Sequence, residues 1–146
     1  GHVRKYGDGG LAGKSLLPIV AAGDRESALG PRGISGDLTD ILWPLLHGTA
    51  HYTGMRPLRP HLVASADRSD AATITVERDR LRHRLTTLDT ETPITYRRLR
   101  GGDYDDDHVL YPTIAPHTFG LRAHHLPASQ PAQAGASERY PRGSGG

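Results

Sequence analysis

The chain has 146 residues, which is enough for one ordinary domain and too few for two. Hydrophobic residues make up only 36% of it, which predicts a thin core, and the absence of cysteine excludes disulfide scaffolds, cysteine-based zinc sites and thiol nucleophiles. A net charge of +2 is too small to indicate nucleic-acid binding, and no apolar run approaches the roughly 18 residues of a membrane span, so we expect a cytoplasmic protein.

The first predicted element is a buried strand of a parallel sheet over residues 15–22. This run is short, nearly all apolar and partly β-branched, and only Pro18 is out of place, because proline cannot donate to a ladder. Residues 23–36 then form a polar loop that contains four glycines. Loops of this length in compact domains are usually functional or disordered.

A helix is predicted from Asp37 to Gly54. The Asp37 side chain can cap the free amides of the first turn, and Gly54 is a typical helix stop. Five apolar residues follow at helical spacing and form one stripe: Leu38, Ile41, Leu42, Leu45 and Leu46. Because Pro44 lies inside this stripe and lacks an amide, we expect a kink there.

The second half of the chain predicts another strand and another helix. Residues 58–66 indicate a second buried strand, and a highly charged helix follows with a narrow apolar stripe that includes Ile74, Leu81 and Leu85. Residues 92–96 are predicted to be extended, and residues 128–146 to be a disordered tail. The order strand, helix, strand, helix is an α/β pattern.

Several motifs have simple structural interpretations. Residues 8–15 nearly match a phosphate-binding loop, but an aspartate replaces the first glycine and a strand follows instead of a helix. The aspartates of residues 103–108 fit no calcium-loop spacing, and adjacent histidines at 124–125 point apart, so no metal site is expected. The arginines of residues 78–84 spread over several helix faces, which favours a solvated helix over a nucleic-acid-reading one.

Five ordered segments together resemble one protein family. Residues 33–48 read GISGDLTDILWPLLHG, which is similar to the G-I-x-G-D and I-L-W-P-I stretches of the NAD(P)H dehydrogenase (quinone) family of flavodoxin-like flavoproteins. Further similar segments are YGDGGLAGK at 6–14, HYTGM at 51–55 with LRP at 58–60, DTETPI at 89–94, and TFGLRAHHLP at 118–127. The resemblance covers residues 6–127.

The resemblance implies an α/β fold with a flavodoxin-like doubly wound parallel sheet. The sequence holds about two strands and two helices of that fold, so residues 1–127 are interpreted as its C-terminal part and the sheet as incomplete. The implied activity is two-electron reduction of quinones by hydride transfer from NAD(P)H, with FAD or FMN as the cofactor and a homodimer as the complete form. The chain begins at Gly1 and its one methionine is Met55, so we expect a truncated protein that is inactive alone.

The resemblance also assigns candidate site residues. The family's T-T-G-G flavin loop is matched by the cofactor-binding candidates Ala21, Ala22, Gly23 and Asp24. Candidates for the substrate pocket are Tyr52, Leu29, Ser35 and His2. Leu29 and Ser35 stand where better known members carry a tyrosine and a histidine, so no catalytic residue is assigned. Tyr52 matches an aromatic residue of the quinone pocket and can equally be a core aromatic at the helix end.

These departures leave two other interpretations open. The chain can be a non-catalytic, flavodoxin-like interaction or regulatory subunit, because Leu29 and Ser35 cannot take over the family's proton relay. It can also be a gene remnant without function.

Overall fold

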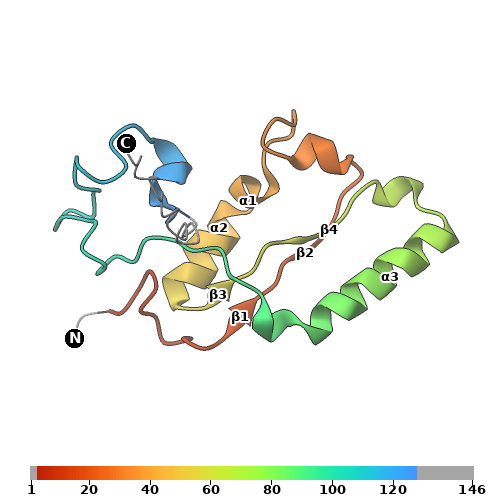
Figure 1. Ribbon diagram of the computed structural model, residues 1–146, viewed down its shortest axis with the longest axis horizontal. Helices are drawn as coiled ribbons and strands as arrows, with labels where there is room; N and C mark the ends of the chain where they lie inside the picture. The colour runs from red at the N-terminus through yellow and green to blue at the C-terminus, as the bar shows by residue number, and fades with distance from the viewer. Residues whose placement is uncertain (1–2, 128–146) are drawn as a thin grey trace, which may run out of the picture.

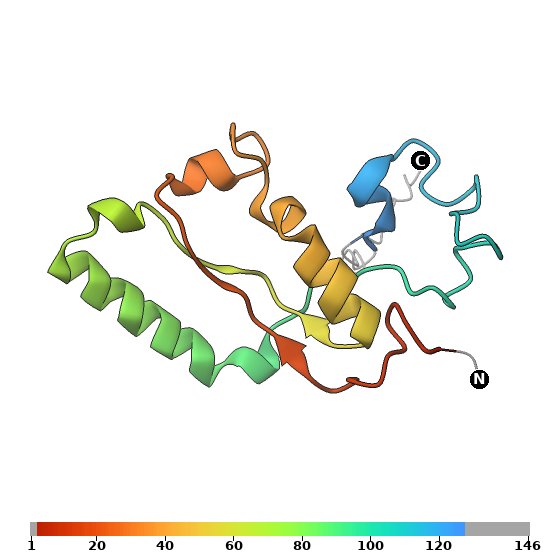
Figure 2. The same ribbon diagram turned by 180° about the vertical axis from the view of Figure 1, so that it is seen from behind.

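The computed structural model of the protein describes residues 3–127, so the predicted disordered tail and His2 lie outside the described residues. The strands and helices are β1 (Ser15–Leu16), β2 (Ile19–Ala21), the 3-10 helix η1 (Glu26–Leu29), α1 (Leu38–Ile41), α2 (Trp43–Leu45), the π-helix η2 (Leu46–His51), β3 (Arg56–Pro57), β4 (His61–Val63), the 3-10 helix η3 (Ala66–Arg68), α3 (Ala71–Thr86), and the 3-10 helices η4 (Leu88–Thr90) and η5 (Gly120–His124). The paired strands run between α3 and the helical segment from α1 to η2 (Figures 1 and 2).

The predicted parallel pairing of the two strand segments is confirmed. β1 pairs with β3 and β2 pairs with β4, both in parallel. The Leu58 amide donates to the Leu16 carbonyl at 2.9 Å, and the His61 amide donates to the Pro18 carbonyl at 2.8 Å. The second segment therefore holds one more residue than the first between these bonds, which is a bulge. Pro18 and Pro60 lie at this interruption because neither has an amide for the ladder.

The prediction that both strands are buried is wrong in part. Ile19 is 55% exposed, and Ala21 at the end of β2 is exposed as well. The reason is the size of the sheets, since each contains only two strands among the described residues. Burial concentrates where the helical segment meets the extended segment at residues 92–96, around Leu46, Ile94 and Tyr96.

The helix predicted over residues 37–54 is present but changes its type twice. Its start is confirmed, because Oδ1 of Asp37 accepts a hydrogen bond from the Thr39 amide at 2.9 Å. The predicted disturbance at Pro44 takes the form of a break at Leu42 followed by a π-helical stretch, in which the Thr49 hydroxyl donates to the Pro44 carbonyl at 3.3 Å. The hydrogen-bond pattern thus adjusts around the missing proline amide.

The helix ends at Gly54, as predicted, and a second glycine explains why. Gly54 has φ +90°, and a Cβ placed on it would lie 2.5 Å from the carbonyl oxygen of Gly9. A Cβ on Gly9 would lie 2.1 Å from the Thr53 carbonyl. Two backbone segments therefore cross in direct contact here, and only glycine at both positions permits this approach.

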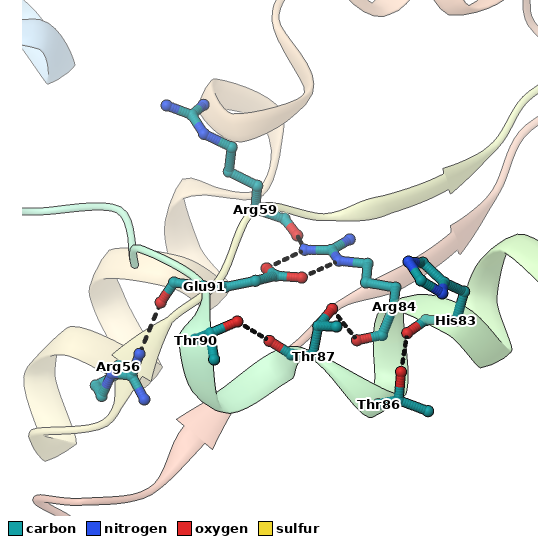
Figure 3. Close-up of polar contacts among 8 residues, drawn as sticks. All are labelled: Arg56, Arg59, His83, Arg84, Thr86, Thr87, Thr90 and Glu91. Atoms are coloured by element: carbon teal, nitrogen blue, oxygen red, sulfur yellow. Dashed lines mark hydrogen bonds and ion pairs between the residues drawn. The ribbon is translucent and has the colours of Figure 1, made fainter.

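α3 is attached to the molecule mainly by polar contacts. It contains no buried residue, and Ile74 and Leu85 of its predicted apolar stripe are 58% and 49% exposed. Its C-terminal end is held by Arg84, whose guanidinium binds both carboxylate oxygens of Glu91 at 2.7 and 2.9 Å and the Arg59 carbonyl at 2.6 Å (Figure 3). The Glu91 carbonyl in turn accepts from Arg56 at 2.8 Å, which links α3 to β3.

Candidate functional site

The loop that follows β2 has its shape fixed by the turn after β4. Three successive carbonyls of this loop accept hydrogen bonds from that turn: Ala22 from the Ala66 amide at 2.9 Å, Gly23 from the Arg68 guanidinium at 2.7 Å, and Asp24 from the Ser65 amide at 2.8 Å. The predicted cofactor-binding residues Ala21, Ala22, Gly23 and Asp24 are therefore held together at the carboxyl end of a parallel strand. In open α/β sheets, ligands bind at this end of the strands.

Two amides of this loop are open to a ligand. Gly23 and Asp24 are exposed, and among residues 3–127 neither backbone amide donates a hydrogen bond. The nearest atoms to a Cβ placed on Gly23 belong to the Asp67 carboxylate, at 3.5 Å, so the glycine leaves the backbone accessible. Free backbone amides beside an exposed glycine fit the edge of a planar ring that accepts hydrogen bonds.

Asp24 and Ser35 close the loop that begins here. Oδ2 of Asp24 accepts a hydrogen bond from the Ser35 hydroxyl at 2.5 Å, and Oδ1 accepts from the Arg25 amide at 3.0 Å. These two bonds hold the pKa of the exposed Asp24 carboxyl below its usual range. The segment predicted to be a polar loop contains η1. A Cβ on Gly33 would lie 2.0 Å from the Ala28 carbonyl, so the loop is tightly folded.

The structure separates the predicted substrate-pocket residues into two places. Leu29 ends η1 and is half-buried in the same loop as Ser35. Tyr52 instead lies just before β3, at the opposite end of the parallel strands from residues 21–24. There its ring meets the Tyr6 ring edge-on, with 5.0 Å between centroids. Tyr52 is 37% exposed, which does not fit a fully buried core aromatic.

A second site, which the sequence analysis missed, is a cluster of histidines and aromatic residues around the π-helix. Trp43 stacks on His47 with 4.1 Å between ring centroids, and His47 and His51 lie 5.0 and 5.3 Å from the ring of Tyr96. Further members of this aromatic–histidine cluster are Tyr6, Tyr104, His124 and His125. The sequence signal was the repeat of ring side chains at positions 43, 47 and 51, one per helical turn.

Burial favours the neutral form of the histidines in this cluster. Burial, together with His51, His124 and His125 nearby, lowers the pKa of His47 to about 4. Burial also lowers the pKa of His124, and the Arg97 guanidinium adds to that effect. Among the residues that the structure describes, no group of three or more His, Cys, Asp or Glu side chains is arranged to hold a metal ion.

The acidic segment at residues 103–108 has structural roles. The Asp103 carboxylate pairs with Arg97 at 2.7 Å. Oδ1 of Asp105 accepts hydrogen bonds from the amides of Asp107 and Val109 at 3.0 and 2.8 Å, which closes a turn. In the described part of the chain, no helix is both long and apolar enough to cross a membrane.

Comparison with known proteins shows which family the chain resembles. The model of a family with a flavodoxin-like fold matches residues 2–85. A ribosyldihydronicotinamide dehydrogenase-like protein, traD, from Penicillium crustosum is 33% identical over 113 residues, which are 77% of this chain and 39% of that protein. Ribosyldihydronicotinamide dehydrogenase [quinone] from Mus musculus is 34% identical over 89 residues, which are 61% of this chain and 38% of the mouse protein.

A solved structure supports the same family and fold. The crystal structure of a protein named a putative quinone reductase, from Klebsiella pneumoniae, superimposes with a TM-score of 0.79 at 37% sequence identity. The match covers 84% of this chain and 48% of that one. The chain thus spans about two fifths of the length of the curated relatives above and about half of this structure. The chain belongs to the flavodoxin-like family that includes the NAD(P)H dehydrogenases (quinone).

Proposed function

We propose that the protein contributes the flavin-wrapping loop of an NAD(P)H-dependent quinone oxidoreductase. The observation that carries this proposal is the loop at residues 21–24, at the carboxyl end of a parallel strand in a chain of this family. Two of its backbone amides donate no hydrogen bond within residues 3–127. Bound FAD or FMN would supply the hydride chemistry, accepting a hydride from NAD(P)H and passing two electrons to a quinone. The protein itself would bind and orient the flavin and keep water away from it.

The roles of the loop residues follow from their contacts. The amides of Gly23 and Asp24 would donate to the ring edge, while Ala21 and Ala22 anchor the loop to the strand. No side chain of the loop is assigned a proton-transfer role, because Leu29 has no polar group and the Ser35 hydroxyl donates to Asp24.

Tyr52 is proposed to act in a homodimer. It lies at the opposite end of the strand segment from residues 21–24, so it cannot line a pocket over its own loop. Its partly exposed ring is available to the quinone pocket of a second copy. A quinone pocket shared between two subunits would make dimerisation a condition for activity.

Flavin titration tests the proposed function. The full chain is titrated with FAD and with FMN while quenching of flavin fluorescence is measured, and saturable binding of one of them is expected. Gly23→Val should weaken that binding at least about tenfold, because the branched side chain obstructs the open amides. Gly10→Val is the matched control, because Gly10 is exposed with no neighbouring atom within 4 Å. Absence of binding by both flavins would contradict the proposal.

The bond between Asp24 and Ser35 favours a second candidate function, that of a non-catalytic interaction or regulatory subunit. In this case the loop is a rigid recognition surface, since its two polar side chains already satisfy each other. A stable complex with a defined partner, formed by a chain that binds neither flavin, would support this alternative over the first.

A further inference from the structure

We propose that a cavity beside the aromatic–histidine cluster binds a small, uncharged planar ring that carries a carbonyl oxygen. The cavity has a volume of about 200 Å³ and is lined by Tyr6, His47, Arg97, Leu99, Tyr104, His108 and His124. It lies near the start of the strand segment, because Tyr6 precedes β1, whereas residues 21–24 follow β2 at the other end. The inference does not depend on flavin binding.

The walls of the cavity are flat and come from four separate parts of the chain. Tyr6 lies 5.2 Å from His47 between ring centroids, and Tyr104 stacks on His124 at 5.9 Å with only 6° between the ring planes. The backbone holds Tyr6 in place, because its amide donates to the Tyr52 carbonyl at 3.0 Å. Such walls favour a ligand with a planar ring, which stacks on aromatic faces.

The volume limits the ligand to a single ring. An apolar cavity of about 150 Å³ accepts benzene, whereas sites for drug-sized ligands have volumes of roughly 300–1,000 Å³. At about 200 Å³, this cavity has room for one six-membered ring with one small substituent. A flavin or a dinucleotide is too large for it.

Two side chains of the lining, Arg97 and His124, have hydrogen-bond donors to spare, which favours an acceptor on the ring. The Arg97 side chain is 11% exposed, and its Nε and Nη1 donate to the Ala123 carbonyl and to Asp103 at 2.9 and 2.7 Å. Its third nitrogen, Nη2, has no acceptor among residues 3–127. The Tyr104 hydroxyl lies 2.9 Å from Nδ1 of His124. When the phenol donates there, the neutral imidazole carries its proton on Nε2, which is a second donor.

The charges around the cavity select a neutral ligand. The guanidinium of Arg97 is already paired with Asp103, so its charge is balanced within the cavity wall. The adjoining surface carries both signs of charge, with Lys5 and Arg100 beside Asp105 and Asp106, so it gives an anion no net attraction. Burial disfavours the charged forms of His47 and His124, so these two rings supply stacking and hydrogen bonds.

Benzamide and benzoate are the matched probes, because they share one ring and differ in the charge of the carbonyl group. The full chain is titrated with each, and NMR resonances of the Tyr104, His124 and Leu99 side chains are followed. Saturable shifts at these residues with benzamide are expected, and binding of benzoate should be at least about tenfold weaker. Absence of saturable shifts at the lining residues, or tighter binding of benzoate, would overturn the proposal.

A cavity-filling variant gives the second test. Leu99→Trp should fill the cavity and abolish benzamide binding, while Leu85→Trp places the same bulk on the exposed surface of α3 and should leave binding unchanged. Equal benzamide affinities of the two variants would contradict the proposed site. If Leu99→Trp does not fold, His108→Ala is used instead, because His108 lines the cavity and is exposed. A benzamide affinity of His108→Ala identical to that of the native chain would count against the site.

Discussion

The Ser35 hydroxyl donates a 2.5 Å hydrogen bond to the Asp24 carboxylate across an eleven-residue separation in the sequence. This bond joins the first and last parts of the loop that the proposed function assigns to the flavin. We expect Ser35→Ala to raise the Asp24 pKa, because that hydrogen bond is the largest cause of its lowering. Amide exchange at residues 24–35 should accelerate, and flavin affinity should fall a few-fold. A Ser27→Ala variant is the control, and equal exchange rates in both variants would refute the role of the bond.

The charge of Asp24 is expected to set the potential of bound flavin. A carboxylate beside a ring that gains negative charge on reduction disfavours the reduced form, so Asp24→Asn should make the midpoint potential more positive. The measurement is a redox titration of the flavin-loaded protein. Asp89→Asn, an exposed position outside the loop, should leave the potential unchanged. A potential that does not move in Asp24→Asn would show that the carboxylate does not influence the ring.

Stability should fall when the pH drops from about 6.5 to 4. The folded protein keeps His47 neutral with a pKa of about 4, whereas the unfolded chain takes up the proton near pH 6.5. A lowered pKa of a basic group means that its stabilising contribution is present above pH 6.5 and is lost towards pH 4, at a cost of up to about 3 kcal/mol for this residue. Burial also lowers the pKa of His51, His124 and His125, so these residues add to the loss of stability at low pH.

Urea unfolding between pH 4 and 8 measures this loss. His47→Phe keeps a ring in the stack on Trp43 but cannot take up a proton, so its stability should depend less steeply on pH than that of the native chain. The control is His83→Phe, on the exposed surface of α3, which should keep the native pH dependence. An unchanged slope in His47→Phe would disprove the assignment.

The Arg84–Glu91 pair should be the main attachment of α3. Both side chains are partly buried, at 19% and 24% exposed. The backbone carbonyl of Glu91 also accepts a hydrogen bond from the Arg56 guanidinium. Glu91→Gln should cost about 1–2 kcal/mol of unfolding free energy and speed amide exchange in α3. The exposed pair of Arg78 and Asp79 is the comparison, and Asp79→Asn should cost less than about 0.5 kcal/mol.

The crossing of Gly54 with Gly9 should tolerate no side chain. Gly54→Ala adds a Cβ 2.5 Å from the Gly9 carbonyl, on top of the strain of φ +90°. Gly13 has a similar φ of +85° with open space around it, so Gly13→Ala carries the conformational strain alone, about 1–2 kcal/mol. Thermal unfolding should show a clearly larger loss for Gly54→Ala, and equal losses would mean that the crossing can relax.

Local signals in the sequence were sufficient to predict both ends of the helix at residues 37–54 and the parallel pairing of the strands. Asp37 and Gly54 act through neighbouring backbone, so the start and the stop of the helix could be predicted from residue type. Parallel pairing followed from two apolar runs separated by a helix. The π-helix after Pro44 was not predicted, because a proline indicates a disturbed helix but not which hydrogen bonds replace the lost one.

Features that depend on distant residues were missed or only inferred through the family resemblance. Burial of the strands was predicted from their composition, but it depends on what covers them, and Ile19 is largely exposed. The aromatic–histidine cluster joins Tyr6, Tyr96 and His124 to the π-helix, and no local pattern predicts that these segments meet. The bond between Asp24 and Ser35 likewise depends on the tight turn at Gly33.

Residues 6–9 are bound to the end of the helix at Gly54, and this contact has a practical consequence for labelling the protein. The bonds are between backbone atoms, from the Tyr6 and Gly7 amides to the carbonyls of Tyr52 and His51 at 3.0 and 2.8 Å, so they do not depend on neighbouring side chains. The chain has no cysteine, and a Cβ on Gly10 would touch nothing within 4 Å. A single thiol introduced there would carry a fluorophore or spin label close to Tyr6 without disturbing the backbone that positions it.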